Sequence, residues 1–498
     1  MSSTITSSSS IEQWDLTSKV SPFLDRHMMF PLLEYLDSLI SSGTCAYPSK
    51  DVATARLALL GPTHMVDYAM DIYQQLHPNS TIPDEMIAQK KQVYEELEQL
   101  KASCHPLIEL VQNTEEKQKL IASGQWNLPS LEISHHITSA MLDAFLKLSK
   151  YYFECGDYQT SRDHLEAYIS LLAKPPPVTE EEEDVLNPNV PATATSIGNP
   201  QIYYLENVTS TTLTVLWGKL AAEILVEDWD ASRVALEAVQ HGLESLVTSR
   251  ELTALEALQQ RTWLLHWSLF VYWNAKQGGL ETLVDLFFSE RYKQAMTTNA
   301  PHLLRYLTAA VLLCKRRIAK KASLETRRLL KNLTSAMADC DYTDPVVEFV
   351  HNLCVVFDFE QAQIKLAECE HVLQADFFLC KQTALFMEEA RVFVFENYCR
   401  IHNKIDLKTL SDKLAMDQEA AERWIVDLIR NADFQAKIDS SRQCVVMGTD
   451  AQSIYEQVME RTKDLNVRSA TLAQSLHQIL QERNLEASRK ERAAREDY

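Results

Sequence analysis

The side chains best suited to chemistry are five residues between positions 351 and 380: His351, Cys354, Cys369, His371 and Cys380. Such residues bind zinc when short, regular spacings bring four of them around one ion. The spacings here match no such site, and the chain has no CxxC pair. Because unpaired Cys often serves as a small buried apolar residue in a reducing compartment, we interpret the ten cysteines as structural thiols.

Two other segments resemble metal sites and fail on geometry. His135 and His136 are adjacent, so a regular helix or strand cannot direct both rings at one ion. The segment 339–350 begins like a calcium loop, but it has Asp344 where the turn requires Gly and Val350 where a Glu ligand is required. Phosphate-loop, zinc-protease and nucleophile-elbow motifs are also absent from the sequence. We therefore predict no catalytic, cofactor-binding or metal-binding residue, no small-molecule substrate and no enzyme activity.

Composition favours a helical protein that binds other proteins. Only 10 of 498 residues are Gly, which leaves little material for hairpins and phosphate-binding loops. The net charge of −21 argues against a general binder of nucleic acid or anionic membranes. The start of the chain lacks a signal peptide, and its most apolar stretch, 263–273, is too short to span a bilayer. We expect a cytoplasmic protein, possible also in the nucleus, without membrane contact.

Helical periodicity fills most of the first half of the chain. It predicts a helix over 11–40 with a kink or new turn at Pro31, then amphipathic helices over 51–123 broken near Gly61 and His77. Six prolines and the acidic run Glu180–Asp184 predict a disordered linker at 174–200.

A weak internal repeat indicates how these helices pack. The segments 154–161, 226–232 and 357–362 each contain Asp, then an aromatic residue, then a small residue three positions on. We interpret the aromatic residue as a plug between paired helices and the small residue as the point of close approach. The aromatic residues Tyr158 and Trp229 lie about two tetratricopeptide-repeat lengths apart. The pattern favours a stacked α-solenoid over an unrelated helical bundle.

The segment 388–448 has the pattern of a winged-helix domain. Three short helical stretches precede two apolar strands, Phe434–Asp439 and Cys444–Met447, around a polar turn. The exposed positions of the third helix carry more acidic residues than Arg423 and Arg430 can balance, so phosphates would repel it. We predict that this domain binds protein rather than DNA, with Arg423 and Arg430 at the interface.

A long helix is predicted over 451–485, followed by a charged, frayed tail at 486–498. An apolar column repeats every seven residues through Val458, Leu465, Leu472 and Ile479. The second column of the same repeat, three residues after each member of the first, holds Arg461, Arg468 and Ser475. Because a homodimeric coiled coil needs apolar residues in both columns, these residues do not complete a homodimer seam. We expect the apolar column to pack in a groove among other helices.

One segment is strongly basic against the acidic background. Its cations are Lys315, Arg316, Arg317, Lys320, Lys321, Arg327, Arg328 and Lys331. They could contact RNA or an acidic partner, and a solvated helix edge explains them equally well.

Several long motifs resemble a known family. A helical array that ends in a winged helix and a trailing helix is the plan of PCI-domain scaffold proteins. The segments 14–36, 259–274, 301–311 and 421–448 closely resemble the family formed by the e subunits of eukaryotic translation initiation factor three. The similarity covers about residues 12–482, and it departs from the family at the Ser-rich start and the linker.

The resemblance implies a non-catalytic scaffold subunit. Members of the family pair with other PCI and MPN subunits and join a bundle of C-terminal helices. Their N-terminal helices bind the d subunit. They help to place the factor on the small ribosomal subunit, which supports preinitiation complex assembly and mRNA recruitment. The alternatives are a scaffold subunit of the COP9 signalosome or proteasome lid, and a helical-repeat protein that binds RNA.

The expected domains follow from these segments. They are a disordered start (1–11), N-terminal helical repeats (12–173), the linker (174–200), TPR-like helical repeats of the PCI module (201–387), the winged helix (388–448), a C-terminal bundle helix (449–485) and the tail (486–498). The expected fold class is all-α.

Overall fold

The computed structural model describes residues 14–43, 47–172, 208–276, 278–321 and 323–402, and from there on 404–406, 408, 419, 422–423, 425–426, 436–439, 444–447 and 454–496. The chain forms two compact units that meet between Val394 and Phe395. This division and the predicted boundary at 387/388 both fall inside helix α21 (Thr383–Ile401). The predicted disordered segments 1–11 and 174–200 lie outside the described residues.

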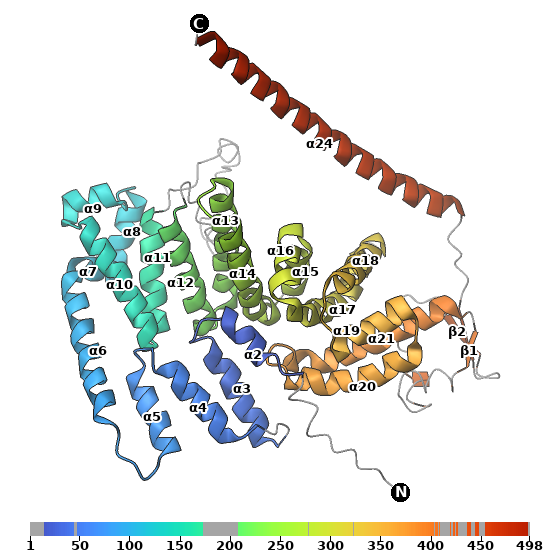
Figure 1. Cartoon of the computed structure of the whole chain (residues 1–498), viewed down its shortest axis with the longest axis horizontal. Helices are drawn as coiled ribbons and strands as arrows, with labels where there is room; N and C mark the ends of the chain where they lie inside the picture. The colour runs from blue at the N-terminus through green and yellow to red at the C-terminus, as the bar shows by residue number, and fades with distance from the viewer. Residues whose placement is uncertain are drawn as a thin grey trace, which may run out of the picture. The chain divides into compact units, whose positions relative to one another are not determined.

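The first unit is an array of helices in which each packs mainly on its neighbours in sequence (Figure 1). The described residues of this unit contain no strand, and the predicted helical-repeat fold is confirmed. Besides α21, its helices are α2 (Thr17–Val20), α3 (Met29–Ser41), α4 (Ser49–Leu60), α5 (Val66–Leu76), α6 (Asp84–Ser103), α7 (His105–Gln112), α8 (Thr114–Ala122), α9 (Leu128–His135), α10 (Ser139–Cys155), α11 (Tyr158–Leu172), α12 (Ser210–Val226), α13 (Trp229–Thr248), α14 (Ala254–Asn274), α15 (Gly279–Phe288), α16 (Glu290–Asn299), α17 (Leu304–Lys321), α18 (Ser323–Asp339), α19 (Pro345–His351) and α20 (Phe359–Ala375), with the short turns η1 (Ser21–Phe23), η3 (Pro301–Leu303), η4 (Asn352–Val356) and η5 (Cys380–Gln382).

The prediction of one helix over 11–40 is wrong. The backbone forms α2 and η1, turns at residues 24–28, and then begins α3 at Met29. The turn forms because the Asp25 carboxylate accepts hydrogen bonds from the backbone N–H and the ring of His27, which offers the chain an alternative to helix. Pro31 lies in the first turn of α3, where its missing N–H costs nothing, so the new turn predicted at Pro31 is present and begins at Met29.

The internal repeat forms three corners between helices, at α10–α11, α12–α13 and η4–α20. At each corner the Asp side chain accepts backbone N–H bonds that cap the next helix: Asp157 from Thr160, Asp228 from Ala231, and Asp358 from Glu360 and Gln361. The small residues Ser161, Ser232 and Ala362 are completely buried, as predicted. The aromatic residues are only half-buried, so they border the helix pairs rather than plug them.

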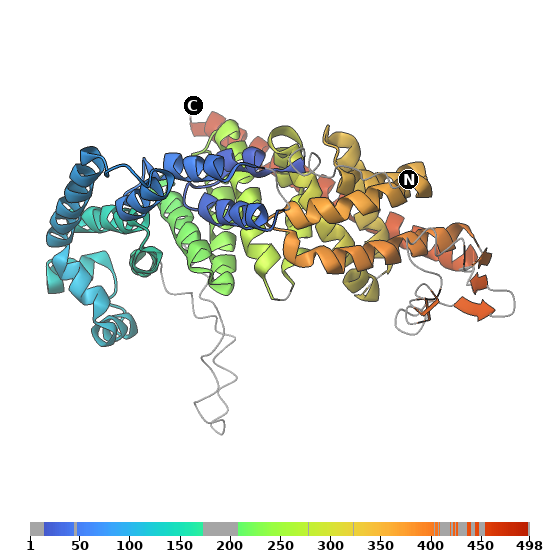
Figure 2. The same ribbon diagram turned by 90° about the horizontal axis from the view of Figure 1, so that it is seen from below.

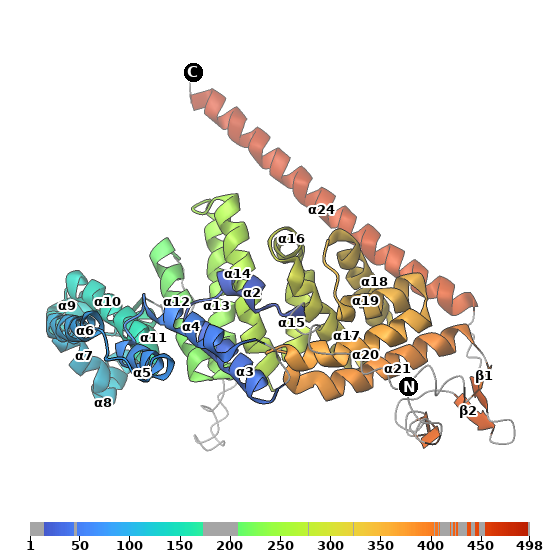
Figure 3. The same cartoon turned by 60° about the horizontal axis from the view of Figure 1, so that its bottom comes forward.

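Residues 14–41, here called the N-terminal strap, pack against helices that come much later in the chain (Figures 2 and 3). The indole Nε1 of Trp267 in α14 donates to the Phe23 carbonyl at 3.0 Å. The Tyr35 hydroxyl donates to the Gln374 carbonyl at the end of α20, at 2.6 Å. The strap therefore connects the middle of the array to its C-terminal part.

The second unit contains the predicted hairpin. Strands β2 (Ala436–Asp439) and β3 (Cys444–Met447) pair antiparallel, with Ile438 opposite Val445. A third strand, β1 (Lys404–Asp406), was not predicted and pairs with the other edge of β3, which gives the order β1-β3-β2. The second predicted helix lies almost wholly outside the described residues, and five residues of the third are described as helical.

The C-terminal helix is longer than predicted. Helix α24 runs from Ile454 to Glu496, so the segment expected to fray is helical up to Glu496.

Candidate protein-interaction surfaces

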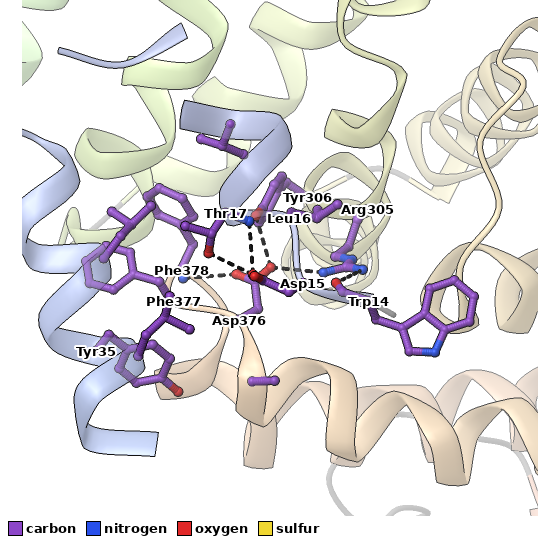
Figure 4. Close-up of a pocket in the computed structure, with 14 residues that line it drawn as sticks. Trp14, Asp15, Leu16, Thr17, Tyr35, Arg305, Tyr306, Asp376, Phe377 and Phe378 are labelled. Atoms are coloured by element: carbon purple, nitrogen blue, oxygen red, sulfur yellow. Dashed lines mark hydrogen bonds and ion pairs between the residues drawn. The ribbon is translucent and has the colours of Figure 1, made fainter. Parts of the chain in front are cut away.

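A buried ionic cluster holds the beginning of the strap. The Arg305 side chain on α17 is 1% exposed. Its Nε lies 2.5 Å from Asp344 Oδ2, its Nη1 lies 3.2 Å from Asp376 Oδ2, and its Nη2 donates to the Trp14 carbonyl at 2.8 Å. Figure 4 shows the guanidinium directed at the Trp14 backbone and the Asp376 carboxylate. A single cation thus joins the strap, α17 and the loops before α19 and after α20.

The remaining oxygens of the cluster are also used. The Tyr306 hydroxyl donates to Asp376 Oδ2 at 2.9 Å, and the backbone N–H groups of Phe378 and Leu379 donate to its Oδ1. Asp344 Oδ1 accepts the Val347 N–H and caps α19. Burial lowers the pKa of Arg305, but the neighbouring carboxylates and tyrosines outweigh it and raise that pKa overall.

This cluster is structural in character. The adjoining cavity measures about 20 Å³, which is room for about one water molecule and for no substrate. Sequence reasoning missed the cluster, although one signal was present: Arg305 stands inside the apolar run 303–313. An Arg at a core position requires buried acidic partners.

A second contact of the strap is a pair of buried histidines. Phe23 stacks on the His266 ring with centroids 4.4 Å apart, and His266 Nε2 lies 3.0 Å from His302 Nε2. Since His266 Nδ1 bonds the Thr262 carbonyl, it carries the proton, and His266 Nε2 accepts a hydrogen bond from His302. Burial lowers the pKa of His266 to about 4 and, with help from the neighbouring ring, that of His302 to about 3, so both rings are neutral.

The first unit also has a groove of about 800 Å³. Its walls come from α10, α11, α12, the turn at 24–27 and Trp267. Trp217 forms part of the wall, and its indole Nε1 is buried without a hydrogen-bond partner. Arg26, Lys147 and Lys150 also line the groove and are exposed. Asp25 and Glu154 line the groove as well, and Lys150 Nζ lies 3.6 Å from Glu154 Oε1. Such a surface suits an apolar peptide that supplies an acceptor to Trp217 and an acidic group to Lys147.

The structure does not gather the His and Cys residues of 351–380 into a metal site. Among the residues that the structure describes, no group of three or more His, Cys, Asp or Glu side chains could hold a metal ion. Cys369 is buried, which raises its pKa and keeps the thiol protonated. Asp344, which stands where a calcium loop would need Gly, is the partner of Arg305.

The predicted basic patch is smaller than the sequence suggested. Lys315 is buried, with its Nζ 4.2 Å from the centroid of the Phe393 ring, so it contributes nothing to a surface patch. Arg327, Arg328 and Lys331 on α18 are exposed. The side chains of Arg316, Arg317, Lys320 and Lys321 lie outside the described set.

In the winged helix, the role of Arg423 and Arg430 at an interface stays a prediction. Arg423 is exposed, 3.5 Å from the equally exposed Glu419, while Ile425 is buried. Arg430 lies outside the described residues.

Helix α24 presents the predicted apolar column to solvent. Its column members are all more than half exposed: Val458 at 57%, Leu465 at 63%, Leu472 at 62% and Ile479 at 52%. Other exposed apolar residues widen this surface, namely Tyr455, Met459, Leu476 and Leu480, whereas the exposed Val467 lies on the opposite side of the helix. An exposed apolar surface of this kind is typical of a protein-binding site, where a partner protein covers it. No helix in the described parts of the chain has both the length and the apolar character needed to cross a membrane.

Two family models match the chain. The model described as PCI domain matches residues 366–449, which include the end of α20, the whole of α21 and the three strands that the structure describes. The model described as eIF3 subunit 6 N terminal domain matches residues 15–152, which include all of the strap except Trp14. Together with the helical array and the hairpin, these matches define a PCI-domain protein.

Full-length relatives identify the family within this class. The E subunit of eukaryotic translation initiation factor 3 from Arabidopsis thaliana is 34% identical, with 96% of this chain and 99% of the relative covered. The E subunit from Aspergillus oryzae is 36% identical over 93% and 92%, and that from Bombyx mori is 35% identical over 95% and 98%. The chain belongs to this family, the E subunits of eukaryotic translation initiation factor 3. The predicted family is confirmed, and the signalosome and proteasome-lid alternatives are set aside.

Proposed function

We propose that this protein is a cytoplasmic, non-catalytic scaffold subunit of initiation factor 3 that assembles with other PCI and MPN subunits. Through them it supports preinitiation complex assembly on the small ribosomal subunit and recruitment of mRNA. The observation that carries the proposal is the apolar surface of α24, whose column residues are more than half exposed. Burying such side chains is favourable by about 25 cal/mol per Å² of apolar surface, so a helix bundle with other subunits would be stabilised by them.

The winged helix and the N-terminal helices provide two further interfaces in this proposal. Arg423 and Arg430 would lie at a contact with a second PCI subunit. The groove beside Trp217 would take a segment of the d subunit, because its apolar walls, the Trp217 indole N–H and the exposed Lys147 suit an apolar peptide with an acidic group.

The test is the double change Leu465→Glu and Leu472→Glu in α24 of the full chain. The matched control is Ala470→Glu with Gln474→Glu, which adds the same charge to exposed positions on the opposite side of the helix. Affinity purification should recover fewer initiation factor 3 subunits with the first variant and a full set with the control. Equal recovery from both would refute the role of the apolar column. Circular dichroism should show that both variants keep the helix content of the parent chain.

A smaller contact with ribosomal or messenger RNA, or with an acidic partner, is proposed at Arg327, Arg328 and Lys331. Their exposure on one helix favours it. Changing all three to Glu should weaken recovery of the small ribosomal subunit and reduce the salt dependence of that interaction. Unchanged recovery and salt dependence would show that these cations are merely solvated.

A further inference from the structure

The groove beside Trp217 contains a glycine that the fold does not require. Gly218 lies in the middle of α12, where glycine weakens a helix. A Cβ atom there would meet Leu165 Cδ1 at 3.5 Å, an ordinary van der Waals contact. At Gly242 in α13, by contrast, a Cβ would lie 3.4 Å from both Leu216 Cδ1 and Val208 Cγ1, so tight helix packing accounts for that glycine. The space that Gly218 leaves free belongs to the groove, which it lines.

Two polar atoms of the groove wall have no hydrogen-bond partner in the described part of the chain. They are Nε1 of Trp217 and Nε2 of His27, whose residue is 3% exposed. His27 Nδ1 lies 2.9 Å from Asp25 Oδ1 and donates to that carboxylate, which leaves Nε2 of the neutral ring as an acceptor. The indole N–H of Trp217 is a donor only. Because buried polar atoms are costly without partners, the groove favours a ligand that offers both a donor and an acceptor.

The charge of the groove favours an acidic ligand. Arg26 and Lys147 line the groove, are exposed, and form no ion pair with a described residue. The two carboxylates of the lining are already engaged within the chain. Asp25 accepts the histidine N–H, and Glu154 Oε1 lies 3.6 Å from Lys150 Nζ. The unmatched cations can therefore attract a carboxylate of a partner.

We propose that the groove takes a segment of the d subunit through a tyrosine or tryptophan that lies over Gly218, with an Asp or Glu next to it in sequence. The ring would pack against Trp217 and Trp267, and its O–H or N–H would donate to His27 Nε2. A backbone carbonyl of the segment would accept from Trp217, and the acidic side chain would meet Lys147. This inference rests on the function proposed above, because it names what the d subunit places in the groove.

The test measures binding of fluorescent peptides that tile the d subunit to the full chain, by fluorescence anisotropy. Gly218→Leu fills the groove with a residue that a helix interior prefers. We expect this variant to unfold at the same or a higher temperature than the parent chain, and to bind the selected peptide at least about tenfold more weakly. Lys147→Glu should also weaken binding, and this effect should disappear when the acidic residue of the peptide is changed to its amide. Changing the aromatic residue of the peptide to Ala should weaken binding at least about tenfold.

Matched controls separate the groove from general stickiness and from general charge. His241→Leu adds the same apolar side chain at an exposed position of α13 outside the groove. Lys276→Glu makes the same charge change at an exposed lysine that does not line the groove. Both variants should bind the selected peptide as the parent does. Deletion of residues 175–199 should also leave the affinity unchanged, whereas a gain of affinity would assign the groove to that segment of the chain itself and overturn the proposal.

Affinity purification separates this inference from the proposed function. The parent chain should recover the full set of initiation factor 3 subunits, and Gly218→Leu should lose the d subunit and keep the others. Recovery of no such subunit by the parent would refute the proposed function. With a full set recovered, the inference alone is overturned if no peptide binds, if Gly218→Leu binds as the parent does, or if the selected peptide lacks an aromatic residue beside an acid. A clear loss of thermal stability in Gly218→Leu would also overturn it, because the fold would then require the glycine.

Discussion

Replacing Arg305 by Met removes a buried cation and leaves its partners in place. Asp344 and Asp376 remain fully buried and face the space that the guanidinium occupied, and the Trp14 carbonyl loses its donor. Breaking a buried ion pair by removing one partner costs about 3–5 kcal/mol. The carboxylates keep hydroxyl and backbone N–H donors, which moderates the loss, so we expect a destabilisation of about 4 kcal/mol.

The free energy of unfolding can be measured by urea denaturation followed by circular dichroism. The control is Arg233→Met, the same change at an exposed pair 3.8 Å from Glu237, which should cost less than about 0.5 kcal/mol. Adding Asp376→Asn to Arg305→Met should restore part of the loss, because one uncompensated charge disappears. Hydrogen exchange should also show faster exchange in the strap. If Arg305→Met costs no more than Arg233→Met, the cluster does not hold the strap.

Two further predictions concern the histidine pair and the repeat corners. Burial lowers the pKa of His266 in the folded chain to about 4 and that of His302 to about 3, whereas an unfolded His has a pKa near 6.5. Below pH 6.5 the unfolded chain therefore binds protons that the folded chain does not, and the stability of the fold falls with pH. Lowering the pH from 7.5 to 5.5 should cost about 1.4 kcal/mol of stability for each ring. The variant His266→Asn/His302→Asn should therefore lose about 3 kcal/mol less stability than the parent over this pH step, and equal pH dependence of unfolding in the two proteins would contradict the assignment. Asp228→Ala should lower stability by about 1 kcal/mol through loss of the α13 cap, while Asp228→Asn should retain most of it in the same denaturation assay.

The sequence revealed the array because its signals are local. Helical periodicity, the break near Gly61 and the buried Ser161 and Ser232 depend on residues within one or two turns of each other. The repeat also contained the Asp caps, although the sequence reading assigned the main role to the aromatic residues, which the structure shows half-buried. At these corners the Asp that caps a helix and the aromatic residue expected to pack are neighbours in sequence. The sequence pattern alone therefore does not show which of the two carries the main role.

The strap could not be predicted because its partners are distant in sequence. Trp14, Phe23 and Tyr35 bind backbone or side-chain groups near residues 305, 267 and 374, and no local pattern encodes those pairings. The burial of Lys315 was hidden for a similar reason, since the sequence shows a basic segment but not the Phe393 ring that covers one of its cations. Lys315 was therefore assigned to the surface only because it lies in a run of charged residues.

The strap also has a consequence for synthesis of the chain. Tyr35 leaves the ribosome long before its acceptor on Gln374, because 339 residues separate the two. At about 5–20 residues per second, the strap waits on the order of half a minute before its last binding partner is made. During that time Phe23 and Leu32 have no finished surface to cover them, so the nascent chain requires shielding by a chaperone or a slow, late docking step. A newly made chain that stops short of α20 would keep its strap exposed, which makes truncated products targets for degradation.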